Sequence, residues 1–356
     1  MSGGVDSAVA AARLLDAGYD VVGVTLHLWD YPDEGDAKSH GRCCAPEDQY
    51  DARRVADFLG FPHFTFDRRE LFEREVVRPF VESYGTGTTP SPCSACNRTV
   101  KLRELGTLAD RLGASHIATG HYARVGTDPV SGLPFLRTGI DGNKDQSYFL
   151  YATPAALLAR MLFPLGESDK PEVRAEALAR KLPGAAKGES QELCFVGQGA
   201  HAYASFVEER LETRKAGPVL DRDGTVVGQH DGIHRFTVGQ RKGLRIALGR
   251  PVFVTSIDSE TGAVSVGDDG DLLASSATLE DVVLAPGIAL PLEADVRIRY
   301  RHGGVRARIV GSADRATLTF LEPVRAVAAG QVAVFYAGDR VLGGGRIERA
   351  ARSVAA

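Results

Sequence analysis

"MSGGVDS" (residues 1–7) opens the chain and decides how its fold is predicted. The residues that follow are good helix formers as far as Gly18, a residue suited to ending a helix. A glycine-rich turn that leads into a helix presents backbone N–H groups and the positive end of the helix dipole, an arrangement that binds phosphate. Ser2 and Ser7 add hydroxyl donors, and Asp6 is placed to cap the helix or to approach a metal ion. The stretch therefore predicts a phosphate-binding loop.

The composition is that of a globular protein. Of 356 residues, 44% are hydrophobic and 25% are charged, which is enough to bury a core in two or three domains. The net charge of −4 excludes a uniformly basic nucleic-acid binder but not a local basic face. No stretch is apolar for long enough to span a bilayer, and no secretory signal precedes the first helix, so we expect a cytoplasmic protein with no membrane partner. In that compartment the five cysteines favour catalysis, redox chemistry or metal binding over disulfides.

The first part of the chain alternates strands with helices. Residues 19–28 (YDVVGVTLHL) and 63–66 (HFTF) are expected to be strands, and residues 115–122 (SHIATGHY) a strand with a turn at its end. The helices between them are expected at 47–60, 69–84 and 97–113. This alternation predicts an α/β fold with a doubly wound parallel sheet, which binds ligands at the carboxyl ends of its strands. The opening loop, Gly120 with its neighbour, and the cysteine loop would all lie on that edge.

After about residue 200 the pattern changes. Residues 217–244 show strand–turn–strand chemistry with Asp-Gly turns, and from about residue 275 short alternating strands predict a small β-barrel or sandwich. We therefore expect three domains, at residues 1–200, 201–270 and 271–356.

The stretch PSPCSACNR places Cys93 and Cys96 in a C-x-x-C immediately before Asn97, where we expect a helix to begin. A thiol at a helix N-terminus has a lowered pKa, so the thiolate is available at neutral pH. Structural zinc is the alternative, with Cys43 and Cys44 as further ligands. Adjacent cysteines are poor zinc spacing, however, and a second C-x-x-C is missing.

Other segments carry polar or sulfur chemistry. Cys194 lies alone in GESQELCFVG, where a cysteine is more often a buried structural residue. Residues 142–150 (GNKDQSYFL) form a polar run before an apolar one, and residues 237–244 (TVGQRKGL) a basic turn suited to an RNA backbone. Residues 297–302 (RIRYRH) interleave arginine with Tyr300 on an expected strand, a surface for stacking and phosphate contacts. Taken singly, each basic element reads as a solvated face.

The opening stretch lacks the G-x-x-x-x-G-K-[ST] pattern of a Walker P-loop and matches the SGGxDS loop (PP-loop) of ATP pyrophosphatases. The chain resembles the bacterial tRNA-specific 2-thiouridylase family. The resemblance rests on seven motifs, which follow one another in the same order as in that family: SGGVDS, PCSACN, ATGHY, NKDQSYFL, ELCF, GQRKGL and GQVAVFY. The resemblance covers essentially the whole chain. It implies a PP-loop ATP-binding catalytic domain in residues 1–200, a small central tRNA-binding domain in 201–270 and a C-terminal β-barrel in 271–356, which together grip the anticodon arm of a tRNA.

The resemblance also implies an activity. In this family the wobble uridine is splayed out, its O2 is adenylated by ATP, and sulfur replaces that oxygen with release of AMP and pyrophosphate. Cys194 would carry the sulfur as a persulfide, and Cys96 would be the nucleophile that frees it and ends disulfide-linked to Cys194. The expected cofactors are ATP and Mg²⁺. The expected partners are a tRNA and a sulfur-donor protein, either a cysteine desulfurase or a sulfur relay.

The family motifs carry over to two further sets of residues. ATP binding is expected at Ser2, Gly3, Gly4, Val5, Asp6, Ser7, Leu26 and Gly120. Contacts to tRNA are expected from Ser91, Pro92, Cys93, His121, Lys144, Asp145, Gln146, Arg299, Tyr300 and Gln331. No residue is expected to hold a resident metal ion.

The chain departs from the family pattern at several points. A PP-loop should follow a strand, but only Met1 precedes it, so we expect either a start further upstream or a sheet without its first strand. Ser91 stands where Asn is frequent, and Cys93 where some members have Asp. Thiolates of Cys93, Cys96 and Cys194 are also the ligands that a [4Fe–4S] cluster with one open iron would use. We favour the persulfide because Cys194 lies in a separate segment suited to disulfide exchange.

Two other functions fit part of these features. One is another PP-loop ligase, such as an argininosuccinate-synthetase-like enzyme, but cysteines in two separate loops and a β-rich tail disfavour it. The other is an RNA-binding or sulfur-relay protein without ATPase activity, which an assay of pyrophosphate release with tRNA would distinguish.

Overall fold

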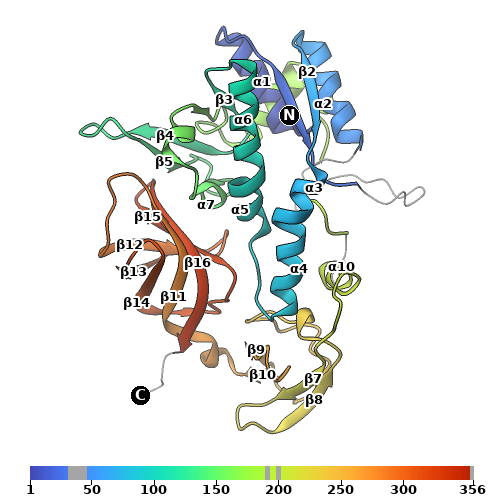
Figure 1. The fold of residues 1–356 in the computed structure, drawn as a ribbon, viewed down its shortest axis with the longest axis vertical. Coiled ribbons are helices and arrows are strands. Elements are labelled where there is room, and N and C mark those ends of the chain that lie inside the picture. Colours follow the sequence, from blue (N-terminus) through green and yellow to red (C-terminus); the bar gives the residue numbers. More distant parts are fainter. Residues whose placement is uncertain (31–45, 189–192, 198–201, 353–356) are drawn as a thin grey trace. The chain divides into compact units, whose positions relative to one another are not determined.

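The computed structural model describes residues 1–30, 46–188, 193–197 and 202–352 (Figure 1). The chain divides into two compact units. The N-terminal unit comprises Met1–Val77, Cys93–Gln198 and Asp339–Val341. The C-terminal unit comprises Arg78–Pro92, Gly199–Gly338 and Leu342–Ala356. Residues 78–92, which lie inside the first expected domain, therefore group with the C-terminal unit.

The N-terminal unit contains parallel strand pairs joined by helices. β1 (Gly23–His27) pairs in parallel with β2 (His63–Asp67), and α2 (Pro46–Leu59) lies between them in sequence. β3 (Ile117–Ala118) pairs in parallel with β6 (Met161–Leu162). These parallel crossovers confirm the predicted α/β class. β1 and β3 are shorter than expected, whereas β2 extends one residue beyond its expected end. Residues 115–122 contribute only two strand residues, because residues 119–122 lie outside the strand.

Met1 lies beside β1. The amino group of Met1 donates to the carbonyl oxygen of Val24, and the Thr25 hydroxyl donates to the Met1 carbonyl oxygen at 2.9 Å. The residue that leads into the opening loop is thus held by β1 through one backbone and one side-chain contact.

The first helix packs against a later one. α1 (Val5–Asp16) begins three residues earlier than expected, so Val5, Asp6 and Ser7 form its first turn instead of a loop. Its partner is α9 (Lys170–Ala179), whose N-terminus is closed by a capping box between Asp169 and Glu172. Apolar side chains of the two helices share one buried cluster, which includes Val5, Ala8, Val9, Val173 and Ala177.

Two long helical stretches are interrupted by π-helical turns. The first consists of α3 (Arg69–Phe72), a π turn (Glu73–Val77) and α4 (Arg78–Gly85). The second consists of α5 (Pro92–Cys96), a π turn (Asn97–Lys101) and α6 (Leu102–Leu112). The expectation that this helix begins at Asn97 was wrong, because proline at the first helical position, Pro92, starts it five residues earlier.

An antiparallel hairpin that the sequence did not predict follows β3. Its strands are β4 (Ala123–Thr127) and β5 (Pro134–Thr138). Within the N-terminal unit, Asp339 accepts hydrogen bonds from Arg124 at 3.0 Å and from Arg137 at 2.9 Å. The hairpin is followed by the short helices α7 (Ser147–Leu150) and α8 (Ala155–Leu158).

The C-terminal unit begins with a small four-stranded sheet in the order β8-β7-β10-β9. Its elements are α10 (Ala202–Glu208), β7 (Gly217–Leu220), β8 (Val226–His230), β9 (Phe253–Ile257) and β10 (Val264–Gly267). The Asp-Gly turn predicted between the first two strands is confirmed, since Asp221 accepts backbone hydrogen bonds across it. Val219, Val254 and Val264 form the centre of its core.

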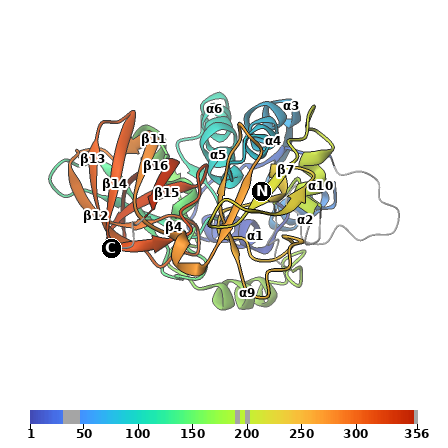
Figure 2. The same ribbon diagram turned by 90° about the horizontal axis from the view of Figure 1, so that it is seen from below.

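The last part of the chain closes into a β-barrel. Its strands are β11 (Leu273–Leu284), β12 (Leu292–Arg297), β13 (Val305–Gly311), β14 (Arg315–Arg325), β15 (Val332–Ala337) and β16 (Arg340–Arg352). They pair in the order β11-β14-β13-β12-β15-β16, and β16 returns to β11 (Figure 2). Of the two predicted alternatives, barrel and sandwich, the barrel is confirmed. Alternating side chains fill its interior.

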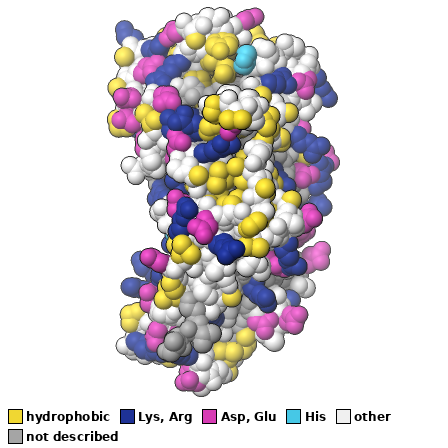
Figure 3. Space-filling model, turned by 90° about the vertical axis from the view of Figure 1, so that its left-hand side faces the viewer, with side chains coloured by type: hydrophobic (Ala, Val, Ile, Leu, Met, Phe, Trp, Pro, Cys, Tyr) yellow, Lys and Arg dark blue, Asp and Glu magenta, His cyan; other side chains and the backbone are white. Residues whose placement is uncertain are grey.

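The surface carries mixed charge. On the face in Figure 3, Lys and Arg side chains are interspersed with Asp and Glu instead of forming one continuous basic area. None of the helices in the described ranges combines the length and hydropathy needed to cross a bilayer.

The barrel core generates a stability prediction. Leu318 on β14 is fully buried, whereas Leu321 on the same strand is 60% exposed. We expect Leu318→Ala to lower the free energy of unfolding by about 3 kcal/mol, because it leaves a cavity, and Leu321→Ala to change it by less than about 0.5 kcal/mol. Chemical denaturation of the full chain, followed by circular dichroism, measures both. Equal losses for the two variants would contradict the described packing.

Candidate functional site

The opening loop has the geometry of an anion-binding turn. Gly3 has a φ of +69°, and a Cβ there would lie 2.2 Å from the Asp48 carbonyl oxygen, so only glycine fits. Gly4 is the N-cap of α1, and among the described residues no side chain caps it. The Ser7 hydroxyl donates to the Gly4 carbonyl oxygen at 2.9 Å and accepts from the Ser2 N–H at 3.2 Å. The first turn of α1 therefore keeps backbone N–H groups available for an anion.

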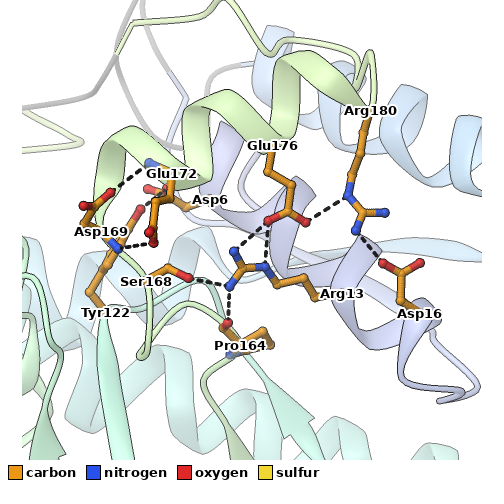
Figure 4. Close-up of polar contacts among 10 residues, drawn as sticks. All are labelled: Asp6, Arg13, Asp16, Tyr122, Pro164, Ser168, Asp169, Glu172, Glu176 and Arg180. Carbon is orange, nitrogen blue, oxygen red and sulfur yellow. Dashed lines mark hydrogen bonds and ion pairs between the residues drawn. The ribbon is translucent and has the colours of Figure 1, made fainter.

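Asp6 lies in the first turn of α1, and its carboxylate faces α9. Lys170 Nζ donates to both Asp6 oxygens, at 2.7 and 2.8 Å, and the Tyr122 hydroxyl donates to Oδ1 at 2.9 Å (Figure 4 shows Asp6 with Tyr122). The expectation that Asp6 caps the helix was wrong, because Gly4 occupies the cap and Asp6 is already helical. The alternative expectation was that Asp6 approaches a metal ion. In the structure the Asp6 carboxylate is already paired with the ammonium group of Lys170.

Ion pairs extend this contact along α1 and α9 (Figure 4). Arg13 donates to Glu176 at 2.6 and 2.9 Å, and also to the Pro164 carbonyl oxygen. Arg180 pairs with Glu176 at 2.9 Å and with Asp16. These groups are partly exposed, so each pair contributes little by itself, but together they fix how α9 lies along α1.

Tyr122 connects the opening loop to the segment 142–150. Its backbone N–H donates to Gln146 Oε1 at 3.0 Å, and its carbonyl oxygen accepts from the Gln146 N–H at 2.9 Å. Because the hydroxyl of the same tyrosine donates to Asp6, one residue joins two of the predicted site segments, through its backbone on one side and its side chain on the other.

Asp145, beside Gln146, is buried, and its carboxylate accepts hydrogen bonds from neighbouring residues of its own segment. Its Oδ1 accepts from the N–H groups of Gly139 and Ser147 at 3.1 Å each, and its Oδ2 accepts from the Ser147 hydroxyl at 3.0 Å. Asp145 therefore shapes the backbone of its own segment. Lys144 lies in the turn closed by its N–H bond to the Asp141 carbonyl oxygen.

Gly120 lies against the first turn of α1, and His121 follows it in sequence. A Cβ on Gly120 would come within 2.9 Å of the Asp6 carbonyl carbon and 3.0 Å of the Ser7 nitrogen, so glycine permits the close approach. Desolvation, aided by the charge of Lys101, lowers the pKa of His121 to about 3. His121 is thus neutral at physiological pH and interacts as a hydrogen-bonding group, not as a cation. Leu26 is buried in β1.

The C-x-x-C cysteines lie within α5. Cys93 is exposed in its first turn, whereas Cys96 is buried at its last residue with helical dihedral angles. Both thiols were expected just before a helix N-terminus at Asn97, but the helix begins at Pro92, so both lie inside it. The dipole effect falls off within the first turn, which contains Cys93 but not Cys96. A π turn begins directly after Cys96.

Cys194 is half-buried, and its neighbour anchors it. Phe195 packs edge-to-face on Phe72, with ring centroids 5.6 Å apart, and on Trp29 at 6.2 Å. Phe195 is therefore the residue that packs in the core, and the Cys194 thiol lies at the edge of that core.

Lys187, seven residues before Cys194, is anchored close to the opening loop. It pairs with Asp48 and, at 3.1 Å, with Asp51. Burial opposes its charge, but the hydrogen bonds to the two carboxylates outweigh this and raise the pKa of Lys187. Asp48 is also the residue whose backbone Gly3 contacts, so the chain leading to Cys194 and the opening loop share one anchor.

Five of the predicted residues belong to the C-terminal unit: Ser91, Pro92, Arg299, Tyr300 and Gln331. Gln331 donates from Nε2 to the carbonyl oxygens of Thr89 and Pro90 at 3.0 Å each, and so holds the chain just before Ser91 and Pro92. Arg299 and Tyr300 were expected on a strand, but β12 ends at Arg297 and both lie in the following turn. Arg299 is exposed there and Tyr300 is half-buried.

The described ranges contain no group of three or more His, Cys, Asp or Glu residues placed to hold a metal ion. The thiols of Cys93, Cys96 and Cys194 therefore do not form the ligand set of a [4Fe–4S] cluster in this structure, and the cluster alternative does not fit. Cys43 and Cys44 lie outside the described residues.

Comparisons with known proteins match the chain along its length. Three family models fit successive parts: the tRNA methyl transferase HUP domain at residues 1–198, the tRNA methyl transferase PRC-barrel domain at 204–268 and the aminomethyltransferase beta-barrel domain at 280–347. The chain is 61% identical to the tRNA-specific 2-thiouridylase MnmA of Sorangium cellulosum, an alignment that covers 100% of this chain and 93% of that protein. The chain belongs to the tRNA-specific 2-thiouridylase family. The proteins of the same name from Solibacter usitatus and Moorella thermoacetica are 46% and 47% identical, over 98% and 99% of this chain.

Membership of the 2-thiouridylase family confirms the resemblance drawn from the motifs, and the HUP, PRC-barrel and β-barrel matches confirm the predicted fold class. Sequence reasoning missed several residues that organise the site: Tyr122, Asp141, Lys170 and Lys187. The tyrosine lies in a motif that was noticed, and a D-K-P-E capping-box pattern marks the start of α9. The pairing of Lys170 with Asp6 spans 164 residues, and no local pattern indicates it.

Gly3 generates a prediction with a matched control. Gly18 also has positive φ, at +82°, but a Cβ there meets nothing within 4 Å. Gly18→Ala should cost about 1 kcal/mol of unfolding free energy, the backbone strain alone, and Gly3→Ala about 3 kcal/mol, because it also displaces Asp48. Denaturant titration of both variants measures this. Similar losses would show that the opening loop does not press on α2 as described.

Proposed function

We propose that this chain is an ATP-dependent enzyme that replaces the C2 oxygen of a tRNA wobble uridine with sulfur. The observation that carries the proposal is the uncapped first turn of α1, joined through Asp6 and Tyr122 to Gln146 in the segment that the family motif assigns to tRNA. Both thiols needed for sulfur transfer, Cys96 and Cys194, belong to the same compact unit as this turn.

ATP would bind with its phosphates on the first turn of α1. The backbone N–H groups of the first turn of α1 supply donors, and Gly120 leaves room for the chain to pass close to Asp6. The hydroxyls of Ser2 and Ser7 would exchange their present acceptors, the Ser7 oxygen and the Gly4 carbonyl oxygen, for phosphate oxygens. Leu26 would line the nucleotide pocket. Mg²⁺ would arrive on the nucleotide phosphates, since the described carboxylates form no set that holds it. It supplies charge neutralisation, and no step proposed here depends on it.

The residues proposed to contact the tRNA are those that the family motifs assign. We propose that eight residues contact the tRNA: Ser91, Pro92, Cys93, His121, Lys144, Gln146, Arg299 and Tyr300. Asp145 and Gln331 are proposed to act indirectly, because their polar atoms hold the neighbouring backbone. The wobble base has to leave its stack so that C2 becomes accessible.

The reaction divides into activation and sulfur transfer. The uridine O2 attacks the α-phosphorus of ATP, and pyrophosphate leaves. The terminal sulfur of a Cys194 persulfide then attacks C2, loses its proton and expels AMP, which leaves the base joined to Cys194 through two sulfurs. The Cys96 thiolate attacks the Cys194 sulfur, releasing 2-thiouridine and forming a Cys96–Cys194 disulfide. A dithiol reductant restores the two thiols, and a sulfur-donor protein recharges Cys194.

Cys194→Ser tests the assignment. Thiolation should fall to background, while the first turnover of tRNA-dependent pyrophosphate release keeps a rate within about twofold of the unmodified enzyme, because activation does not use this thiol. Mass spectrometry of the tRNA and a coupled pyrophosphate assay measure the two steps. Normal thiolation by this variant would overturn the persulfide assignment. A wild-type chain that binds tRNA but releases no pyrophosphate would instead favour an RNA-binding or relay protein.

Cys96→Ser gives an independent trap. Without the resolving thiol, the tRNA should stay linked to Cys194 in an adduct that dithiothreitol cleaves, visible as a shifted band on a denaturing gel. Stoichiometric iron after anaerobic purification, with no adduct, would reinstate the cluster alternative.

A further inference from the structure

We propose that Lys170 is a positioning residue for ATP binding, which acts by neutralising Asp6 and so keeps a negative charge away from the nucleotide phosphates. This inference rests on the proposed function, because it assumes that the first turn of α1 receives ATP. It assigns a role to α9, which none of the recognised motifs includes.

The contact between the two residues is close and sheltered. Lys170 Nζ lies 2.7 and 2.8 Å from the two Asp6 oxygens, and its side chain is 10% exposed. Its ammonium lies 5.8 Å from the centroid of the Tyr122 ring, whose hydroxyl donates to the same carboxylate. Asp6 is therefore bound by two donors from separate segments.

The position of Asp6 makes this neutralisation necessary. Asp6 is the second residue of α1, within the turn whose N–H groups would bind the phosphates. An unpaired carboxylate there would repel a polyphosphate, and because the site is partly buried, solvent and salt would screen this repulsion only weakly. The carboxylate oxygens would also compete with the phosphates for the same N–H donors. Pairing with Lys170 turns the carboxylate toward α9 and cancels its charge.

The fold holds Lys170 rigidly in place. It is the first residue of α9, directly after the Asp169 of the capping box, and its own N–H donates to Asp141 Oδ2 at 3.1 Å. Farther along, the Arg13–Glu176 pair fixes α9 against α1. The ammonium group thus reaches Asp6 from a pre-organised helix, with little entropy left to lose.

Two other roles for these residues give opposite results on mutation. If Lys170 itself binds a phosphate, then removing Asp6 as well cannot repair its loss. If Asp6 is a ligand of nucleotide-bound Mg²⁺, then removing its charge weakens binding of the Mg²⁺–ATP complex.

The test is a set of variants of the full chain titrated with Mg²⁺–ATP by isothermal calorimetry. Lys170→Met should raise the Kd about tenfold, because it leaves the Asp6 charge unpaired. Asp6→Asn/Lys170→Met should return the Kd to within about twofold of wild type, and Asp6→Asn alone should bind as tightly as wild type or more tightly. Arg180→Gln is the matched control: it breaks the Asp16 pair of the same two helices, and it should lower the melting temperature without changing the Kd.

Each outcome is decisive. Weak binding by the double variant would assign Lys170 to the phosphates directly, and weak binding by Asp6→Asn would assign Asp6 to the metal; either overturns the inference. An unchanged Kd in Lys170→Met also overturns it. If the wild-type chain does not bind ATP, the result contradicts the proposed function itself and is thereby distinguished from a failure of the Lys170 inference.

Discussion

The carboxylate of Asp6 is the point on which the arrangement of the N-terminal unit depends. A negative charge in a half-sheltered position has to be paired, because leaving it unpaired costs more than the pairing itself contributes. Lys170 and Tyr122 supply the partners, so satisfying one residue of the opening loop fixes α9 and the turn after β3 at once. Through the backbone of Tyr122, the constraint reaches Gln146. The loop that would bind phosphates and the segment assigned to RNA are therefore parts of one hydrogen-bonded structure.

The two cysteines proposed to transfer sulfur are positioned in a different way. Neighbouring residues anchor the chain, and the cysteines themselves lie at or beyond the ends of helices and strands. Cys96 is the last residue of α5, just before a π turn, and such turns are frequent at functional sites. Cys194 is held by Phe195 in an aromatic cluster on one side and by Lys187 upstream on the other. Neither anchor uses the thiol.

The sequence predicted the class of fold and the segments of the site better than the contacts within it. Glycine turns, the parallel strand pattern and the alternating strands near the C-terminus each follow from local chemistry, and so α2, β1, β2 and the barrel were predicted with correct types. Errors arose where one residue moved a boundary. Pro92 starts α5 early and moves Cys96 away from the helix N-terminus, and β12 ends before Arg299. Pairs such as Asp6 with Lys170 join distant parts of the chain, so only the folded structure reveals them.

The central claim is that the first turn of α1, with its one acidic side chain neutralised, is where nucleotide phosphates bind. Hydrogen–deuterium exchange of the full chain, with and without saturating Mg²⁺–ATP, tests it directly at the backbone amides concerned. The account predicts strong nucleotide-dependent protection in the peptide that covers residues 1–10, because those N–H groups become hydrogen-bonded to phosphate oxygens. If nucleotide binds measurably while this peptide exchanges at an unchanged rate, the phosphates bind elsewhere and the account is contradicted.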